Sequence, residues 1–314
     1  GLWLHGAAPS QLSPSMKAAA GKVKEEAERL TAGLWLPMML AAGYLLVLNA
    51  NRASFYEHVN HPDGAYSTAW FALPACMTAL YLTSVFGLTK YFESRKPMTG
   101  LKDYMFTYNL YQVIINVWCV VAFCVEVRRA GMSAIGNKVD LGPNSFRLGF
   151  VTWVHYNNKY IELLDTLWMV LRKKTQQVSF LHVYHHVLLI WAWFCVVKFC
   201  NGGDAYFGGL LNSIIHVLMY SYYTMALLGW SCPWKRYLTQ AQLVQFCICL
   251  AHSVWAAVTK VYPPHICLVE IWVMVSMLVL FTRFYRQAYA KEAKAKEAKR
   301  AEAMAAQPKA VKAE

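Results

Sequence analysis

The chain has 314 residues, 57% of them hydrophobic and 15% aromatic, and its 30 basic and 17 acidic residues give it a formal net charge of +13. This composition and a positive mean hydropathy of +0.29 are typical of polytopic membrane proteins and exclude an ordinary soluble globular enzyme. The positive charge suits anionic lipid headgroups or a polyphosphate substrate, whereas nucleic acid is excluded as a partner because no soluble basic fold is present to bind it.

A membrane-spanning helix needs about 20 predominantly apolar residues. The candidate spans, in chain order, are 34–50, 68–89, 105–126, 148–171, 180–199, 208–229, 238–259 and 266–284. Because their connections are short, they predict one all-α polytopic bundle without a separate soluble domain. The chain therefore divides into an N-terminal segment (1–67), a transmembrane domain (68–290) and a charged tail (291–314).

The first candidate span, 34–50, is short and contains Pro37 and Gly43. Proline and glycine both weaken a helix interior. The sequence leaves open whether this segment crosses the membrane or lies on its surface.

The basic residues between the spans predict the orientation, because cytosolic loops are enriched in Lys and Arg. Loops 90–102, 172–174 and 235–236 and the tail after Arg283 are basic, whereas 200–207 and 261–265 contain neither residue type. The basic loops and the C terminus are therefore expected in the cytosol, although loop 127–147, with four basic residues, fits this pattern less well.

Span 148–171 carries polar residues at steps of three and four, which place them on one helix face. These residues are His155, Asn158, Lys159, Glu162, Asp165 and Thr166. Lys159 and Glu162 are close enough in sequence to pair, which makes both tolerable at membrane depth. The alternative is an ion pair that only sets the register of neighbouring helices.

The run 177–186, Q-V-S-F-L-H-V-Y-H-H, places three histidines at the start of an apolar span. On a helix His182 lies one turn from both His185 and His186, so the three rings can converge on one side. Such a cluster suits proton transfer, acyl transfer or metal ligation. The alternative is a purely structural cluster of hydrogen-bonded histidines.

Two later spans add polar groups. In span 208–229 His216 lies one turn from Asn212 and Tyr220, which we expect to flank its ring and fix its tautomer. Span 238–259 contributes Gln242 and Gln245, uncharged groups suited to orienting a carbonyl or thioester.

Four stretches together resemble, in order and spacing, the signature boxes of the ELO-type fatty acid elongases: K-Y-I-E-L-L-D-T (159–166), Q-V-S-F-L-H-V-Y-H-H (177–186), N-S-I-I-H-V-L-M-Y-S-Y-Y (212–223) and T-Q-A-Q-L-V-Q-F (239–246). The resemblance covers about residues 68–290. It implies seven transmembrane helices in the endoplasmic reticulum, six of them around an acyl tunnel. Strings such as D-A-Y-F-G also resemble microalgal polyunsaturated elongases, particularly those acting on twenty-carbon Δ5 acids.

The resemblance implies condensation of an acyl-CoA with malonyl-CoA to a 3-ketoacyl-CoA two carbons longer, with loss of carbon dioxide. It implies no cofactor and no metal, with malonyl-CoA as co-substrate and membrane lipids as surroundings. The expected protein partners are the 3-ketoacyl-CoA reductase, dehydratase and enoyl reductase of the cycle, and a homodimer is left open.

The resemblance also implies roles for individual residues. His185 and His216 would hold the acyl group as an acyl-imidazole, with His182 and His186 as base and orienting partners. The substrate-binding candidates are Lys159, Glu162, Asp165, Asn212, Tyr220, Gln242 and Gln245, and for the CoA phosphates Arg172, Lys173, Lys174, Lys235 and Arg236.

Two other classes remain as alternatives. A di-iron membrane desaturase or hydroxylase also contains H-x-x-H-H, but it needs about eight histidines in three boxes, and spans outside 182–186 offer only His155, His216 and His252. A seven-helix receptor or transporter has no need of adjacent histidines beside a basic loop.

Overall fold

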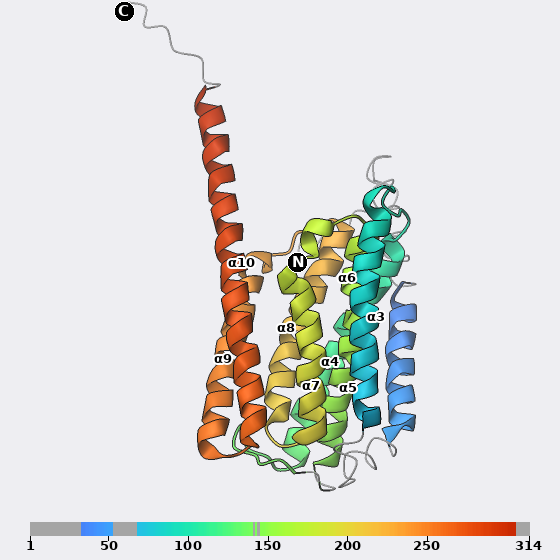
Figure 1. The fold of residues 1–314 in the computed structure, drawn as a ribbon, viewed down its shortest axis with the longest axis vertical. Coiled ribbons are helices and arrows are strands. Elements are labelled where there is room, and N and C mark those ends of the chain that lie inside the picture. Colours follow the sequence, from blue (N-terminus) through green and yellow to red (C-terminus); the bar gives the residue numbers. More distant parts are fainter. Residues whose placement is uncertain (1–32, 53–67, 141, 143–144, 306–314) are drawn as a thin grey trace, which may run out of the picture.

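The computed structural model describes residues 33–52 and 68–305 except 141, 143 and 144, and within these residues every regular element is a helix (Figure 1). The labelled α-helices are α3 (Thr68–Glu93), α4 (Lys102–Arg129), α5 (Phe146–Glu162), α6 (Leu164–Leu171), α7 (Phe180–Phe199), α8 (Ala205–Leu228), α9 (Leu238–Thr259) and α10 (Pro264–Ala305). Two short 3₁₀ helices, η3 (Thr175–Gln177) and η4 (Lys235–Tyr237), precede α7 and α9. The predicted all-α class is confirmed.

Six of the described helices are long and apolar enough to cross a membrane: Gly33–Ala50, Phe71–Glu93, Lys102–Arg129, Phe180–Phe199, Lys235–Thr259 and Pro264–Gln287. The helix at Gly33–Ala50 lies along the bundle, where the Tyr44 hydroxyl donates to the carbonyl of Val154 on α5 at 2.9 Å. The Tyr44 ring also packs edge-on against Tyr111 of α4, with 6.1 Å between the centroids. This first segment, which the sequence left open, is therefore long enough to span and packs against two of the main helices.

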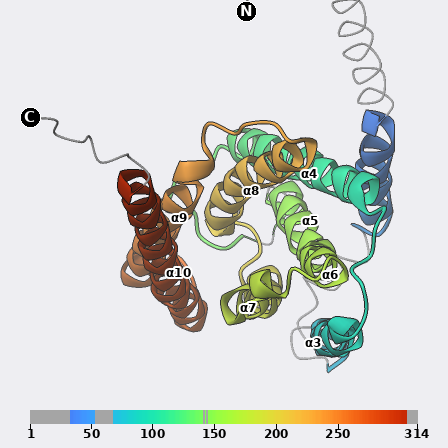
Figure 2. The same ribbon diagram turned by 90° about the horizontal axis from the view of Figure 1, so that it is seen from above.

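Six helices form a closed ring. Going round it, α4 contacts α8, α8 contacts α9, α9 contacts α10, α10 contacts α7, α7 contacts α5, and α5 returns to α4. Helix α3 lies outside this ring against α6 and α7, as the view along the bundle shows (Figure 2). The ring encloses the polar faces of α5, α7 and α8, so the polar residues that the sequence singled out on these three helices lie inside the bundle.

The stretch expected as a single span at 148–171 is divided into α5 and α6 at Leu163. The Leu163 N–H donates to the carbonyl of Tyr160 at 3.3 Å, an i to i−3 bond that tightens the backbone locally. Its φ of −60° and ψ of −23° stay in the helical region. The two helices therefore continue one another, and Glu162 and Asp165 lie on either side of the junction.

The two ends of the bundle differ in chemistry. At one end the basic loops gather: the Met98 N–H donates to the carbonyl of Leu171 at 2.9 Å, which joins the α3–α4 loop to the end of α6. At the other end Asp204, just before α8, accepts from the N–H groups of Gly136 and Asn137 at 2.7 and 2.9 Å. Burial would raise the pKa of Asp204, but these bonds and the ring of His252 hold it below its ordinary value.

Candidate active site

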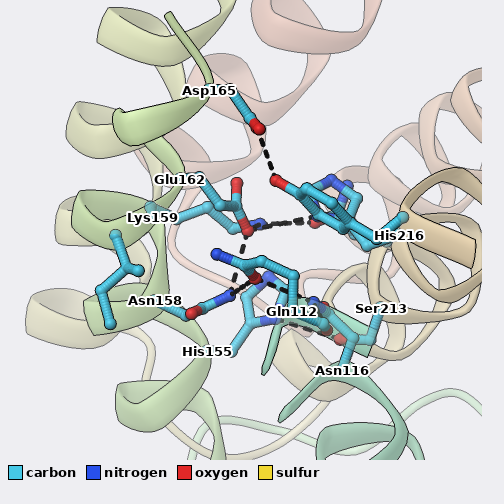
Figure 3. A network of polar contacts seen from close by, with 12 residues as sticks. Gln112, Asn116, His155, Asn158, Lys159, Glu162, Asp165, Ser213 and His216 are labelled. Carbon is cyan, nitrogen blue, oxygen red and sulfur yellow. Dashed lines mark hydrogen bonds and ion pairs between the residues drawn. The ribbon is translucent and has the colours of Figure 1, made fainter. Parts of the chain in front are cut away.

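A buried ion pair lies at the centre of the site. On α5 the Lys159 amino group lies 2.8 Å from Glu162 Oε1, and the two side chains are 2% and 1% exposed (Figure 3). The same amino group donates to Asn212 Oδ1 of α8, also at 2.8 Å. The predicted pairing is confirmed, and a charge buried this deeply is tolerable because its partner and its hydrogen bonds are both in place.

Helix α4 extends this network with residues that the sequence analysis did not single out. Asn158 Nδ2 donates to Gln112 Oε1 at 2.8 Å and to Glu162 Oε1 at 3.2 Å. Asn116 Nδ2 donates in turn to the Gln112 carbonyl at 2.8 Å. A signal was present, since Asn109, Gln112 and Asn116 recur at steps of three and four within an apolar span.

His216 lies beside the ion pair, and the Tyr220 ring packs edge-on against it with 5.7 Å between the ring centroids. Its Nδ1 is 3.2 Å from Glu162 Oε1, although the two are not aligned as a hydrogen bond. Asn212 is bonded to Lys159, and the Tyr220 hydroxyl donates to Asp165 Oδ2 at 2.6 Å. Tyr220 therefore flanks the His216 ring as expected, but the expectation that Asn212 and Tyr220 fix its tautomer is wrong, because both form hydrogen bonds with charged groups on α5 and α6 instead.

The predicted convergence of the three histidines on α7 is observed. Ring centroids are 4.6 Å apart for His182 and His186, and 5.5 Å apart for His185 and His186. The helix starts here because Ser179 caps it, its hydroxyl accepting from the backbone N–H of His182 at 3.3 Å. The His185 Nδ1 faces the Met277 sulfur at 3.4 Å, a weak partner that leaves the ring available for chemistry.

Two cavities share His185 in their lining. The mouth cavity, of about 410 Å³, opens toward the basic end and is lined among others by His182, His216, Gln242 and Lys235. The inner cavity, of about 70 Å³, is narrower and largely apolar and runs toward Asp204. Its wall includes Trp193, Asn212, Gln245 and Met274. His185 thus lies between a charged compartment and an apolar one, and the other site histidines line the charged one.

The fold brings two of the five predicted basic residues to cavities of the site. Lys235, in η4, lines the mouth cavity. Arg172, just after α6, lines a neighbouring cavity of about 370 Å³, which also has Asp165 in its wall. A cation at each opening suits an anionic ligand.

The other three basic residues do not line these cavities. The Lys173 amino group donates to the backbone carbonyls of Glu93 and Arg95 at 3.1 and 3.0 Å. It therefore holds the α3–α4 loop in place instead of facing a ligand. Lys174 and Arg236 are exposed at the same end of the bundle.

Comparisons with known proteins all point to a single protein family. Residues 66–297 match the family described as "ELO: GNS1/SUR4 family". The chain is 35% identical over 252 residues to "Very long chain fatty acid elongase 2" of Mus musculus, covering 76% of this chain and 85% of that protein. It is 35% identical over 223 residues to "Very long chain fatty acid elongase 4" of Homo sapiens, covering 68% and 70%. It is 36% identical over 231 residues to "Very long chain fatty acid elongase 7" of Rattus norvegicus, covering 67% and 80%. The family match includes five helices of the ring completely and α10 as far as residue 297.

Proposed function

The chain belongs to the ELO (GNS1/SUR4) family, and from this premise we propose that it is the condensing enzyme of fatty acid elongation. It joins malonyl-CoA to a long-chain acyl-CoA, releases carbon dioxide and forms a 3-ketoacyl-CoA two carbons longer. The observation that supports this proposal is that His185 lines both an apolar cavity and a charged one. The apolar lining of the first suits an acyl chain and the charged lining of the second suits a CoA ester, with the thioester between them.

The first step is acyl transfer to an imidazole. A ring nitrogen of His185 attacks the thioester carbonyl, the carbon–nitrogen bond forms, and the carbon–sulfur bond breaks to release CoA. The proton of the attacking ring leaves with the CoA sulfur, so an acyl-imidazole remains. We rank His185 above His216 as the carrier because it belongs to both cavities, whereas His216 lines only the mouth cavity and lies against Glu162.

The second step forms the carbon–carbon bond. Malonyl-CoA loses carbon dioxide, and the electron pair of the broken bond becomes the enolate of its thioester. The enolate carbon attacks the acyl-imidazole, and the imidazole leaves with the electrons of the carbon–nitrogen bond and regains a proton. Asn212, at the inner cavity, and Gln242, at the mouth, are donors for the oxyanions that develop in these steps.

The cellular setting follows from the same proposal. The enzyme acts as a multi-pass protein of the endoplasmic reticulum membrane with its basic end and C terminus in the cytosol, where CoA esters are found. It needs no metal or other cofactor, and it passes its product to a 3-ketoacyl-CoA reductase, a dehydratase and an enoyl reductase.

The preferred substrate is expected to be a twenty-carbon polyunsaturated acyl-CoA with a Δ5 double bond. Several cis double bonds curl a chain, and a cavity walled by aromatic and thioether side chains such as Trp193 and Met274 can follow that curve. A straight saturated chain then loses wall contacts, each mismatched methylene being worth roughly 1–3 kcal/mol.

A competition assay tests both levels of the proposal. Purified protein receives malonyl-CoA with equal amounts of eicosapentaenoyl-CoA, an eighteen-carbon Δ6 acyl-CoA and stearoyl-CoA, and 3-ketoacyl-CoA products are measured by mass spectrometry. The twenty-carbon chain is expected to dominate. If the saturated chain wins, the polyunsaturated assignment is wrong; if no chain gains two carbons, the condensing function itself is wrong.

Charge reversal at Lys235 is expected to raise KM for both CoA esters about tenfold while changing kcat little, because this residue faces the common CoA moiety away from the bond that forms. High salt should reduce the difference, since charges at an open mouth are screened. Arg236→Glu is the matched control, one residue along the chain and outside the cavity lining. Equal KM values for Lys235→Glu and the control would remove Lys235 from the CoA site.

A further inference from the structure

Helix α3 lies outside the six-helix ring (Figure 2). One of its side chains, Tyr81, nevertheless reaches the histidine cluster. Tyr81 is 5% exposed, whereas its helix neighbours Leu80 and Phe86 are 60% and 69% exposed. The Tyr81 hydroxyl lies 2.8 Å from Thr166 Oγ1, and Thr166 Oγ1 lies 2.8 Å from His182 Nε2. A chain of three side chains thus runs from α3 through α6 to α7.

The conformation of Thr166 sets this chain apart from ordinary helix packing. Threonine in a helix commonly donates to the carbonyl one turn earlier. Thr83, Thr152 and Thr224 all do so, at 2.7, 3.2 and 2.9 Å. Thr166, which is fully buried, instead directs its hydroxyl to another side chain on either side.

The direction of the hydrogen bonds follows from counting hydrogens. Among the described residues Thr166 is the hydrogen-bond partner of the Tyr81 hydroxyl, so the phenolic hydrogen must go to Thr166 or remain unpaired in a buried position. Thr166 then donates its own hydrogen to His182 Nε2. The opposite direction would leave the Tyr81 hydrogen without an acceptor. His182 Nε2 is therefore an acceptor, and the ring hydrogen of neutral His182 is on Nδ1.

We propose that Tyr81 and Thr166 are positioning residues that hold His182 as an Nδ1–H hydrogen-bond donor at the condensation site. His182 lines the mouth cavity, so a substrate oxygen that reaches its second nitrogen finds a donor and not a base. Tyr81 also packs against His186, with 6.0 Å between the ring centroids. Helix α3 is then part of the active site, although it is not one of the six helices that form the ring of the bundle.

This inference rests on the proposed condensing function, and it concerns rate rather than affinity. A fixed donor stabilises the oxyanion of the transition state more than the ground-state carbonyl, so its loss lowers kcat and leaves KM nearly unchanged. A purely structural role for Tyr81 and Thr166 would instead lower the amount of folded protein without this division between kcat and KM.

Four variants test the chain of hydrogen bonds. Thr166→Val removes the hydroxyl and keeps the shape, and we expect kcat to fall about tenfold. Thr166→Ser keeps the hydroxyl and should restore kcat to within about twofold of the wild type. Tyr81→Phe keeps the ring and should lower kcat about fivefold, and the Tyr81→Phe/Thr166→Val double variant should be no worse than Thr166→Val alone.

Tyr91→Phe is the matched control, because it removes a phenol from the same helix at a position that is 52% exposed. Each variant is purified in detergent, and kcat and KM are measured for acyl-CoA and malonyl-CoA with 3-ketoacyl-CoA as the readout. Tyr81→Phe decides the case even if Thr166→Val does not fold: wild-type kcat in Tyr81→Phe overturns the inference. A wild-type protein that forms no 3-ketoacyl-CoA overturns the proposed function and this inference with it, whereas an active wild type with unaffected variants overturns the inference alone.

Discussion

Replacing His185 with alanine will lower the turnover of condensation by at least about a thousandfold, while the protein still accumulates and stays monodisperse in detergent. The reason is that the substitution removes the group proposed to carry the acyl chain, a ring that lines both cavities. The packing lost with it is limited to the contacts with Met277, His186 and Phe281. His216→Ala should have an effect of similar size, since its ring lies beside the ion pair and lines the mouth cavity.

The measurement is single-turnover formation of 3-ketoacyl-CoA with purified protein. His265→Ala is the control, because this exposed histidine lies in the first turn of α10 at the opposite end of the bundle and lines neither cavity. A trapped acyl-enzyme in the wild type that disappears in His185→Ala would support the covalent route. Near-normal turnover in either active-site variant would show that its histidine is structural.

Lys159→Met is expected to destabilise the folded protein by about 3–5 kcal/mol, because it leaves the Glu162 carboxylate buried without its counter-charge. The Lys159→Met/Glu162→Gln double variant removes both charges and should recover most of the lost stability, yet stay inactive because the polar centre is gone. Thermal denaturation in detergent, followed by the fraction of monodisperse protein, measures the difference.

The chain provides a matched control for this pair. Glu126 and Arg129 on α4 have the same spacing as the buried pair, but the Arg129 side chain is 37% exposed. Arg129→Met should therefore lower the free energy of unfolding by at most about 1 kcal/mol. If Arg129→Met and Lys159→Met lose the same amount of stability, the burial of Lys159 and Glu162 has no energetic consequence.

The parts of the site that could be predicted from sequence lie within single helices. The convergence of His182, His185 and His186 and the pairing of Lys159 with Glu162 follow from helical spacing alone, which fixes which side chains share a face. The all-α class and the approximate span boundaries follow from runs of apolar residues, because a bilayer demands that length and hydropathy.

The parts that could not be predicted depend on how each helix is rotated against its neighbours. The bond from Lys159 to Asn212 and the chain from Tyr81 through Thr166 join different helices, and spacing in one helix does not specify its rotation. The error at His216 has the same origin: Asn212 and Tyr220 do lie one turn away, but they turn toward charged groups on α5 and α6.

The Lys159–Glu162 pair also bears on how the protein enters the membrane during synthesis. Helix α5 has 17 residues, and it is not among the described helices that are long and apolar enough to cross alone. A lone charged side chain at mid-membrane costs roughly 2.5–3.5 kcal/mol on the scale of translocon insertion. Because both charges are on α5, they can neutralise one another before any later helix has been made.

The apolar α4 is synthesised just before α5, and its Gln112 side chain can already accept the hydrogen bond from Asn158. Helices α4 and α5 are therefore expected to enter the membrane together as a hairpin. Asn212 would join only when α8 follows, which makes assembly of the reactive centre a late event in biogenesis.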